Sequence, residues 1–151
     1  MNPLIWTGAI LLATAIFFLL SAGSEMKLSA ATIAALARSA GFSGDDIKTA
    51  VAIALAESGG NPKNIGDKTL APERGPSYGL WQINMGTKVH GSEFAAYDVF
   101  DPQVNANLAF HLYHRAGNSF RDWSTFTQND PKTGRPYYEA HLSTAEIGVN
   151  A

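Results

Sequence analysis

The feature that most constrains this chain is an apolar run without charged residues near its N-terminus, residues 3–23. A helix rises about 1.5 Å per residue, so roughly 20 such residues can cross the hydrocarbon core of a bilayer. Trp6 lies near one end of the run, where its ring suits the membrane interface, and Lys27 follows the other end. The sequence therefore predicts one N-terminal transmembrane helix, residues 1–23, followed by a separate domain, residues 24–151.

A cleaved secretory signal is the alternative interpretation of this run. Ser21, Ala22 and Gly23 are the small residues that a cleavage site needs. However, no basic residue precedes the run, and it is longer than the apolar core of a typical signal peptide. The uncleaved anchor is therefore preferred. Either interpretation places the rest of the chain at or beyond a membrane.

The remaining residues are enough for one domain with a core and too few for two. A net charge of −2 gives no strong basic field, which argues against nucleic acid as a partner. The chain has no cysteine, which excludes disulfides, thiolate zinc sites and cysteine nucleophiles. His111 and His114 lie one turn apart on an expected helix without acidic residues at ligand spacing, so neither a metal nor a cofactor is expected.

Hydrophobic periodicity and residues typical of helix ends predict the helices of this domain. Ser43 and Asp101 are suited to N-cap positions, and Pro102 suits a first helical turn. Gly41 and Gly117 favour the C-terminal ends of two helices. The expected helices are residues 28–40, 43–58, 101–117 and 136–146.

The segment between the second and third helices lacks helical periodicity. Residues 63–84 contain several glycines and prolines and end in a half-alternating run of apolar and polar residues. This pattern favours a long loop that carries a small β-hairpin. Phe120, Trp123 and Phe126 follow the third helix as an aromatic cluster, which is expected to belong mainly to the core. The expected fold class is therefore α+β, mostly α.

Glu57 carries the strongest chemical signal in the sequence. It shares one face of the second helix with Ala50 and Ile53, at helical spacing. Burial on that face disfavours an ionised carboxylate, and the negative end of the helix dipole acts in the same direction. We therefore expect a raised pKa, which suits an acid that protonates a glycosidic oxygen. The alternative is a structural role, in which Glu57 caps the helix or pairs with Arg74 or Arg115.

Two sequence blocks resemble the signature of the soluble lytic transglycosylase (SLT) domain of the lysozyme-like superfamily. They are Ala56-Glu57-Ser58-Gly59-Gly60-Asn61-Pro62 and Gly75-Pro76-Ser77-Tyr78-Gly79-Leu80-Trp81-Gln82-Ile83-Asn84. With a weaker similarity further on, the resemblance covers residues 45–126. The family's aromatic–asparagine–alanine–glycine segment is absent, and the run from Trp123 to Phe126 stands in its place. The resemblance implies a lysozyme-like fold and cleavage of the glycan strands of bacterial peptidoglycan.

The resemblance also assigns roles to individual residues. It makes Glu57 the general acid and places Ser77 and Gln82 in the cleft, where they bind sugar. Tyr78 is expected to stack on a pyranose ring, because aromatic faces suit the apolar faces of sugars. Trp81 is expected to contact sugar as well, with a place in the core as its alternative.

The same glutamate serves two reactions. A lytic transglycosylase works with one carboxyl group and forms a 1,6-anhydro product, as the resemblance implies, and this is the preferred interpretation. A muramidase hydrolase needs a second carboxylate, for which Asp67 is the candidate, and a turn residue is its alternative role. A non-catalytic peptidoglycan-binding virion protein is a further alternative, which the retained Glu57 argues against.

The expected partners follow from the anchor and the resemblance. They are peptidoglycan glycan strands, the lipid bilayer through residues 1–23, and virion or secretion-apparatus proteins. We expect a single-pass protein of a bacterial or virion membrane, with the catalytic domain facing the periplasm or cell wall. The small size and the Gly-Leu-Trp-Gln-Ile run favour local wall opening during phage entry or release, with a wall-opening enzyme of a secretion or pilus system as the alternative. A holin-like protein, in which the apolar run alone is functional, is another interpretation.

Overall fold

The computed structural model describes residues 26–151, and the predicted anchor, residues 1–23, lies outside this described part. Within the described part, no helix combines the length and the hydropathy that a membrane crossing requires. The fold is mostly helical with a small antiparallel sheet, which confirms the predicted α+β class. The elements are α2 (Ala30–Ala40), α3 (Asp45–Ser58), β1 (Ile65–Gly66), β2 (Ser77–Tyr78), β3 (Ile83–Asn84), α4 (Pro102–Arg115), α5 (Ser124–Thr127), the 3-10 helix η1 (Tyr137–His141) and α6 (Leu142–Val149).

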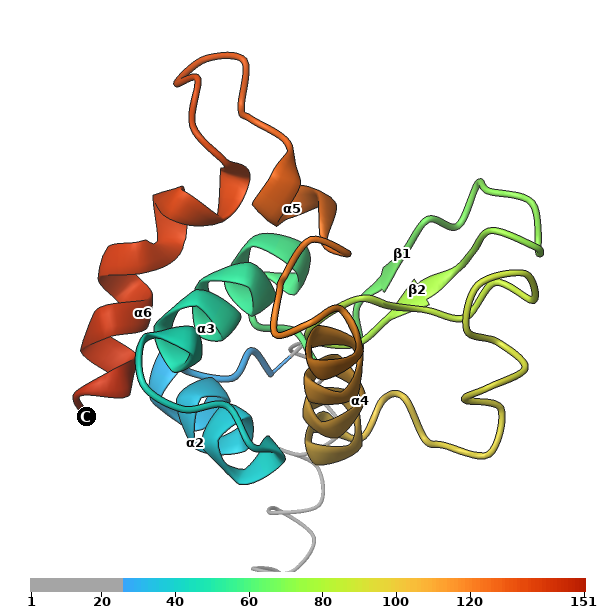
Figure 1. The fold of residues 1–151 in the computed structure, drawn as a ribbon, viewed down its shortest axis with the longest axis horizontal. Coiled ribbons are helices and arrows are strands. Elements are labelled where there is room, and N and C mark those ends of the chain that lie inside the picture. The colour runs from blue at the N-terminus through green and yellow to red at the C-terminus, as the bar shows by residue number, and fades with distance from the viewer. Residues whose placement is uncertain (1–25) are drawn as a thin grey trace, which may run out of the picture.

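The helices and the sheet occupy different sides of the domain (Figure 1). α2, α3 and α6 pack together on one side, whereas β1, β2 and the long loops that follow them extend on the other. α4 lies between the two parts, and α5 packs beside α3. The pocket that Glu57 lines lies where α3, the sheet and the start of α5 meet.

α3 is the central helix of the domain. Residues 50–54 are completely buried in it, because α2, α6 and η1 all pack against this helix. Gly59 ends α3 in the left-handed conformation, with φ of 61°, and its N–H donates to the carbonyl oxygen of Leu55 at 2.8 Å. Glu57 lies in the last turn, where the helix leaves the core, and it is half-buried.

The predicted start of the third helix, α4, is confirmed, whereas the predicted N-cap of the second helix, α3, is not. α4 begins as predicted, since Asp101 Oδ1 accepts a hydrogen bond from the Val104 N–H at 2.8 Å and Pro102 is its first residue. The predicted N-cap at Ser43 is wrong. Gly44 holds that position with a φ of 56°, a conformation that favours glycine, and no side chain caps the helix.

The first and last predicted helices are shifted. α2 starts slightly later than predicted, because Ser29 is its N-cap and Ser29 Oγ accepts a hydrogen bond from the Thr32 N–H at 3.2 Å. The last predicted helix begins as η1 and continues as α6 to Val149. It packs closely on α2, since a Cβ added to Gly148 would lie 2.5 Å from Ala30 Cβ.

The predicted hairpin is part of a three-stranded antiparallel sheet in the order β1–β2–β3. In its register, Tyr78 pairs with Ile65 on one side and with Ile83 on the other. The β2–β3 pairing continues beyond the strands, where the Met85 N–H donates to the carbonyl oxygen of Pro76 at 2.8 Å. Strands this short carry too few residues to show an alternating pattern, so the additional strand had no clear signal in the sequence.

Asn105 fastens the sheet to α4 from inside the core. The residue is 1% exposed, and its Oδ1 accepts a hydrogen bond from the Trp81 N–H at 2.9 Å. Its Nδ2 donates to the carbonyl oxygens of Tyr78 and Val99 at 3.0 and 2.9 Å. Gly79 makes room for this amide, because a Cβ there would lie 2.3 Å from Asn105 Nδ2. The buried amide of Asn105 therefore joins the turn between β2 and β3 to α4.

Candidate active site

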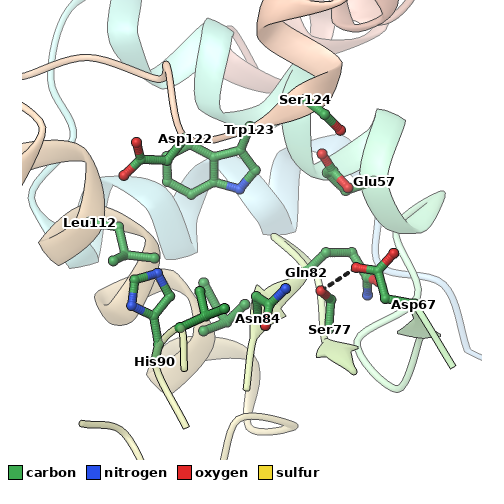
Figure 2. Close-up of a pocket in the computed structure, with 12 residues that line it drawn as sticks. Glu57, Asp67, Ser77, Gln82, Asn84, His90, Leu112, Asp122, Trp123 and Ser124 are labelled. Carbon is green, nitrogen blue, oxygen red and sulfur yellow. Dashed lines mark hydrogen bonds between the residues drawn. The ribbon is translucent and has the colours of Figure 1, made fainter. Parts of the chain in front are cut away.

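A pocket of about 270 Å³ opens between the last turn of α3, the sheet and the start of α5. Glu57 and Ser124 lie on one side of it, and Asp67 and Ser77 face them from the other side (Figure 2). Carboxyl and hydroxyl groups therefore line both sides of this end of the pocket. Such groups can exchange protons and hydrogen bonds with a sugar polymer.

Glu57 presents a partly buried carboxyl group to the pocket. Burial raises its pKa above the ordinary value of 4.5. Thr125 opposes this effect, since its Oγ1 donates a hydrogen bond to Glu57 Oε1 at 2.7 Å and thereby stabilises the carboxylate. The negative charge of Asp67 raises the pKa further. The net direction is upward, which confirms the predicted direction and burial as its main cause.

Arg74 and Arg115, the alternative partners of Glu57, do not pair with it within residues 26–151. Arg115 Nη1 donates to both carboxylate oxygens of Glu93 at 2.9 Å. Arg74 lies exposed on the loop before β2. In this part of the chain, the hydrogen-bonded partner of the Glu57 carboxyl group is the neutral hydroxyl of Thr125 and not a cation.

Asp67 lies in a turn and also lines the pocket, whereas a catalytic role for it stays a prediction. It is a turn residue directly after β1, with a φ of 56°. Its side chain also lines the pocket, and its Oδ2 accepts a hydrogen bond from Ser77 Oγ at 2.6 Å. Ser77 is only 3% exposed, whereas Asp67 is exposed to solvent. The second carboxylate therefore lies opposite Glu57, in a much wetter environment.

Two predicted sugar-binding aromatic residues lie elsewhere. Successive residues of a strand point to opposite faces, so Tyr78 lies on the other face of the sheet from Ser77. Its ring packs edge-on against Phe100, with 5.1 Å between centroids, and it is outside the pocket that Glu57 lines. The prediction that Trp81 contacts sugar is wrong, because Trp81 is completely buried and its Nε1–H donates to the carbonyl oxygen of Ala50 at 2.9 Å.

Gln82 lines the pocket, as the sequence predicted for a cleft residue. Its amide also holds the local fold together, because Nε2 donates to the carbonyl oxygens of Gly79 and Asn64 at 2.9 and 3.2 Å. Its backbone has a φ of 48° in the tight turn before β3. Sugar binding by Ser77 and Gln82 stays a prediction.

Comparison with known protein families agrees with this geometry. The family model described as a lysozyme-like domain matches residues 34–125, more than half of the chain and every pocket residue named above. The chain belongs to the lysozyme-like domain family. Neither the curated proteins nor the solved structures gave a significant match. The family match confirms the predicted relationship to lytic transglycosylases of the lysozyme-like superfamily, and it implies a peptidoglycan-cleaving glycosidase.

In this lysozyme-like domain, hydrogen bonds from the side chains of Trp81 and Trp123 connect three segments that surround the pocket. Trp123 Nε1–H donates to the carbonyl oxygen of Trp81 at 2.8 Å. Trp81 in turn donates to Ala50 in α3. These two indole hydrogen bonds connect the start of α5, the turn before β3 and α3. Trp123 is 5% exposed, which confirms it as a core residue, although part of its ring also lines the pocket.

The far end of the pocket was not predicted from the sequence. His90 and Asp122 line it on the side away from Glu57 (Figure 2). Burial and the Arg115 cation lower the pKa of His90, which favours a neutral imidazole. His90 Nδ1 accepts a hydrogen bond from Arg115 Nη2 at 3.3 Å, and Glu93 holds the same guanidinium group.

Thr125 was also missed as a site residue, although it lies in the aromatic run after the third helix. Its hydrogen bond to Glu57 joins residues 68 positions apart, so no local spacing could reveal it. Asn84 and Ser124 line the pocket in the same way, from segments distant in the sequence. Within residues 26–151, no group of three or more acidic or histidine side chains is arranged to hold a metal ion.

Proposed function

We propose that this protein is a membrane-anchored lytic transglycosylase that cleaves the bond between N-acetylmuramic acid and N-acetylglucosamine in peptidoglycan. The observation that carries the proposal is the Glu57 carboxyl group, which lines the pocket with a raised pKa. A carboxylic acid that stays protonated at higher pH than usual can donate a proton to the leaving oxygen of a glycosidic bond. Membership of the lysozyme-like domain family supports the choice of substrate.

The proposed reaction has two steps at one carboxyl group. In the first, Glu57 gives its proton to the glycosidic oxygen while the bond from that oxygen to C1 of the muramic acid breaks. The acetamido group of the same sugar stabilises the positive charge at C1. In the second step, the Glu57 carboxylate takes the proton of the muramic acid 6-hydroxyl. The oxygen of that hydroxyl forms a bond to C1 at the same time. The product is a 1,6-anhydro sugar, Glu57 is protonated again, and no water is consumed.

Hydrolysis by two carboxylates is the second candidate, because Asp67 faces Glu57 in the same pocket. In that reaction Asp67 would act on the opposite side of the sugar from Glu57, as base or nucleophile. We favour transglycosylation because it needs one carboxyl group, and Glu57 is the partly buried one with a raised pKa, whereas Asp67 is exposed. The transglycosylase route requires from Asp67 only its charge, which raises the pKa of Glu57.

A purely peptidoglycan-binding role accounts less well for the site. Burying a carboxyl group without a cation beside it costs free energy, and a binding surface gains nothing from that cost. The direct test is the clearing of purified cell walls by the wild type and by Glu57→Gln, which keeps the size of the side chain. The variant should stay folded by circular dichroism and clear nothing. Glu146→Gln on the exposed face of α6 is the matched control and should clear walls at the wild-type rate. Unchanged clearing by Glu57→Gln would contradict the proposal.

The membrane anchor is part of the same proposal and is supported by the uncharged apolar run at residues 3–23. The domain is fixed close behind it, since the Leu28 N–H donates to the carbonyl oxygen of Gly60 at 2.8 Å. The few residues between the run and Leu28 reach at most about 3.6 Å each. Such a tether keeps the catalytic domain near the bilayer, on the side of the periplasm or wall, which suits local wall opening in phage entry or release. Membrane fractionation of the full-length chain tests the anchor, and recovery in the soluble fraction would argue for a cleaved signal.

A further inference from the structure

Thr125 lies on α5, a helix of four residues that packs beside α3. None of the four residues is fully buried, and Phe126 is the one that packs against the core, with its ring 5.1 Å from that of Tyr138. The helix is also held by Trp123, the residue before it, whose buried indole Nε1–H donates to the carbonyl oxygen of Trp81. Within the helix, Thr127 Oγ1 donates back to the carbonyl oxygen of Trp123 at 3.3 Å. A buried tryptophan therefore positions a short helix at the rim of the pocket.

The hydrogen bond from Thr125 distinguishes the two oxygens of the Glu57 carboxyl group. Thr125 Oγ1 donates to Oε1 at 2.7 Å, and the backbone N–H of Thr125 also acts on this carboxyl group. In a neutral carboxylic acid the carbonyl oxygen is the stronger acceptor, so the bond from Thr125 favours Oε1 as the carbonyl oxygen. The acidic proton is then on Oε2.

We propose that Thr125 is a positioning residue for the reaction of Glu57: it holds the carboxyl group in one orientation and keeps the transferable proton on Oε2. This proposal rests on the proposed function, in which Glu57 first loses a proton and then regains one. If the same oxygen serves both steps, the carboxyl group does not have to rotate between them. Preorganisation of this kind lowers the barrier because the orientation is fixed before the reaction begins.

Thr125 also balances Asp67 across the pocket. The hydroxyl of Thr125 stabilises the carboxylate form of Glu57, whereas the charge of Asp67 stabilises the neutral acid. The other titratable groups that line the pocket, His90 and Asp122, lie at its far end. An acid that must become a base within one turnover needs both forms to be accessible. The opposing effects of a hydroxyl and a carboxylate on Glu57 provide this.

Three variants of the full-length protein in detergent micelles separate positioning from structural support. Thr125→Val removes the hydroxyl at nearly constant volume, and Thr125→Ser keeps a hydroxyl at the same position. Thr127→Val is the matched control, because it removes a hydroxyl from the same short helix without touching Glu57. Two readouts are needed: the NMR titration of the Glu57 carboxyl carbon, and kcat and KM for glycan release as a function of pH.

In Thr125→Val, the pKa of Glu57 should rise above the wild-type value, because the variant loses a donor that stabilises the carboxylate. The basic limb of the kcat/KM profile should move upward with it. We expect kcat to fall about tenfold and KM to change less than about twofold, since the lost contact orients the acid and does not bind substrate. Thr125→Ser should restore both readouts, and Thr127→Val should match the wild type.

Two results would overturn the role of Thr125. One is an unchanged Glu57 titration in Thr125→Val. The other is equal loss of kcat in Thr125→Val and Thr127→Val, which would indicate a structural contribution of α5 alone. Failure of the proposed function is distinguishable from both, because wild-type protein that releases no glycan would contradict that function while leaving the NMR titration of Glu57 measurable.

Discussion

The two walls of the pocket each carry one carboxyl group, and they hold it in different ways. On the helical wall, Glu57 comes from the last turn of a buried helix, is partly buried itself, and is bonded by the neutral hydroxyl of Thr125. On the sheet wall, Asp67 lies on an exposed turn and is bonded by Ser77. The comparison teaches that a partly buried place at the end of a helix raises the pKa of Glu57 and suits its carboxyl group to donate a proton.

The walls also differ in how they are fastened to the domain. The helical wall is continuous with the main core, since residues 50–54 of the same helix are completely buried. The sheet wall has strands of two residues each, and its turn depends on the buried amide of Asn105. The sheet wall should therefore be more sensitive to a single polar substitution than the helical wall.

Removing the carboxyl group from each wall in turn gives the largest expected effect. Glu57→Gln removes the proton donor, and glycan release should fall by about 10³-fold, the size of a typical general-acid contribution. Asp67→Asn keeps an acceptor for Ser77, and release should fall by no more than about tenfold. Initial rates of soluble muropeptide release measure both. A loss in Asp67→Asn as large as that in Glu57→Gln would make the two walls equivalent and favour the hydrolase.

Asn105→Ala tests the fastening of the sheet wall. The change leaves the Trp81 N–H and the carbonyl oxygens of Tyr78 and Val99 without their buried partner. Each unpaired buried group costs about 1–3 kcal/mol, so the free energy of unfolding should fall by about 3 kcal/mol or more. Urea unfolding followed by tryptophan fluorescence measures it. Asn107→Ala, an exposed amide on the same helix, is the control and should cost less than about 1 kcal/mol. Equal costs would show that the buried amide is not what fastens the turn.

The helical wall has a pH signature of its own. Because burial raises the pKa of Glu57 above 4.5 in the folded state, the folded protein favours the neutral acid more than the unfolded chain does. The contribution of Glu57 to stability is therefore present below its unfolded pKa and is lost as pH rises through its folded pKa. The Glu57→Gln side chain does not ionise, so the variant does not lose stability in this way. The free energy of unfolding of Glu57→Gln relative to the wild type should therefore increase as pH rises from about 4 to about 8. Urea unfolding at several pH values checks this, with Glu146→Gln as control; a pH-independent difference would contradict the burial of Glu57.

Arg115→Ala should have the smallest effect on stability. Its ion pair with Glu93 lies at the surface, where such pairs contribute at most about 1 kcal/mol, so unfolding should change by less than that. The pKa of His90 should nevertheless rise, because the variant removes a cation that lowers it. NMR titration of the His90 ring detects this shift. An unchanged titration would show that burial alone sets the protonation of the far end of the pocket.

The sequence predicted best what depends on neighbouring residues. Asp101 and Pro102 marked the start of α4, and the helical spacing of Ala50, Ile53 and Glu57 correctly gave a carboxyl group at the edge of the core with a raised pKa. These are properties of a few consecutive turns of chain. The same local signals placed other helix ends a few residues off, and at the start of α3 they chose Ser43 where Gly44 holds the N-cap position.

Contacts between distant segments could not be read in this way. The alternation around Trp81 allowed either face of the chain to be the core, and the choice is made by Ala50 and Asn105, which lie far away in the sequence. The bond between Thr125 and Glu57 depends on how α5 is positioned by buried tryptophans. Local patterns do not show such packing. Of the residues opposite Glu57, Ser77 was supplied by the family resemblance and Asp67 by the need of a hydrolase for a second carboxylate.

The chemistry of the two unequal carboxyl groups is tested most directly by mass spectrometry of the products released from purified peptidoglycan. If Glu57 alone performs both proton transfers, the wild type and Asp67→Asn should release fragments that end in 1,6-anhydro muramic acid, and Glu57→Gln should release none. Fragments with reducing ends, formed by the wild type and lost in Asp67→Asn, would contradict the account and make Asp67 the second catalytic carboxylate of a hydrolase.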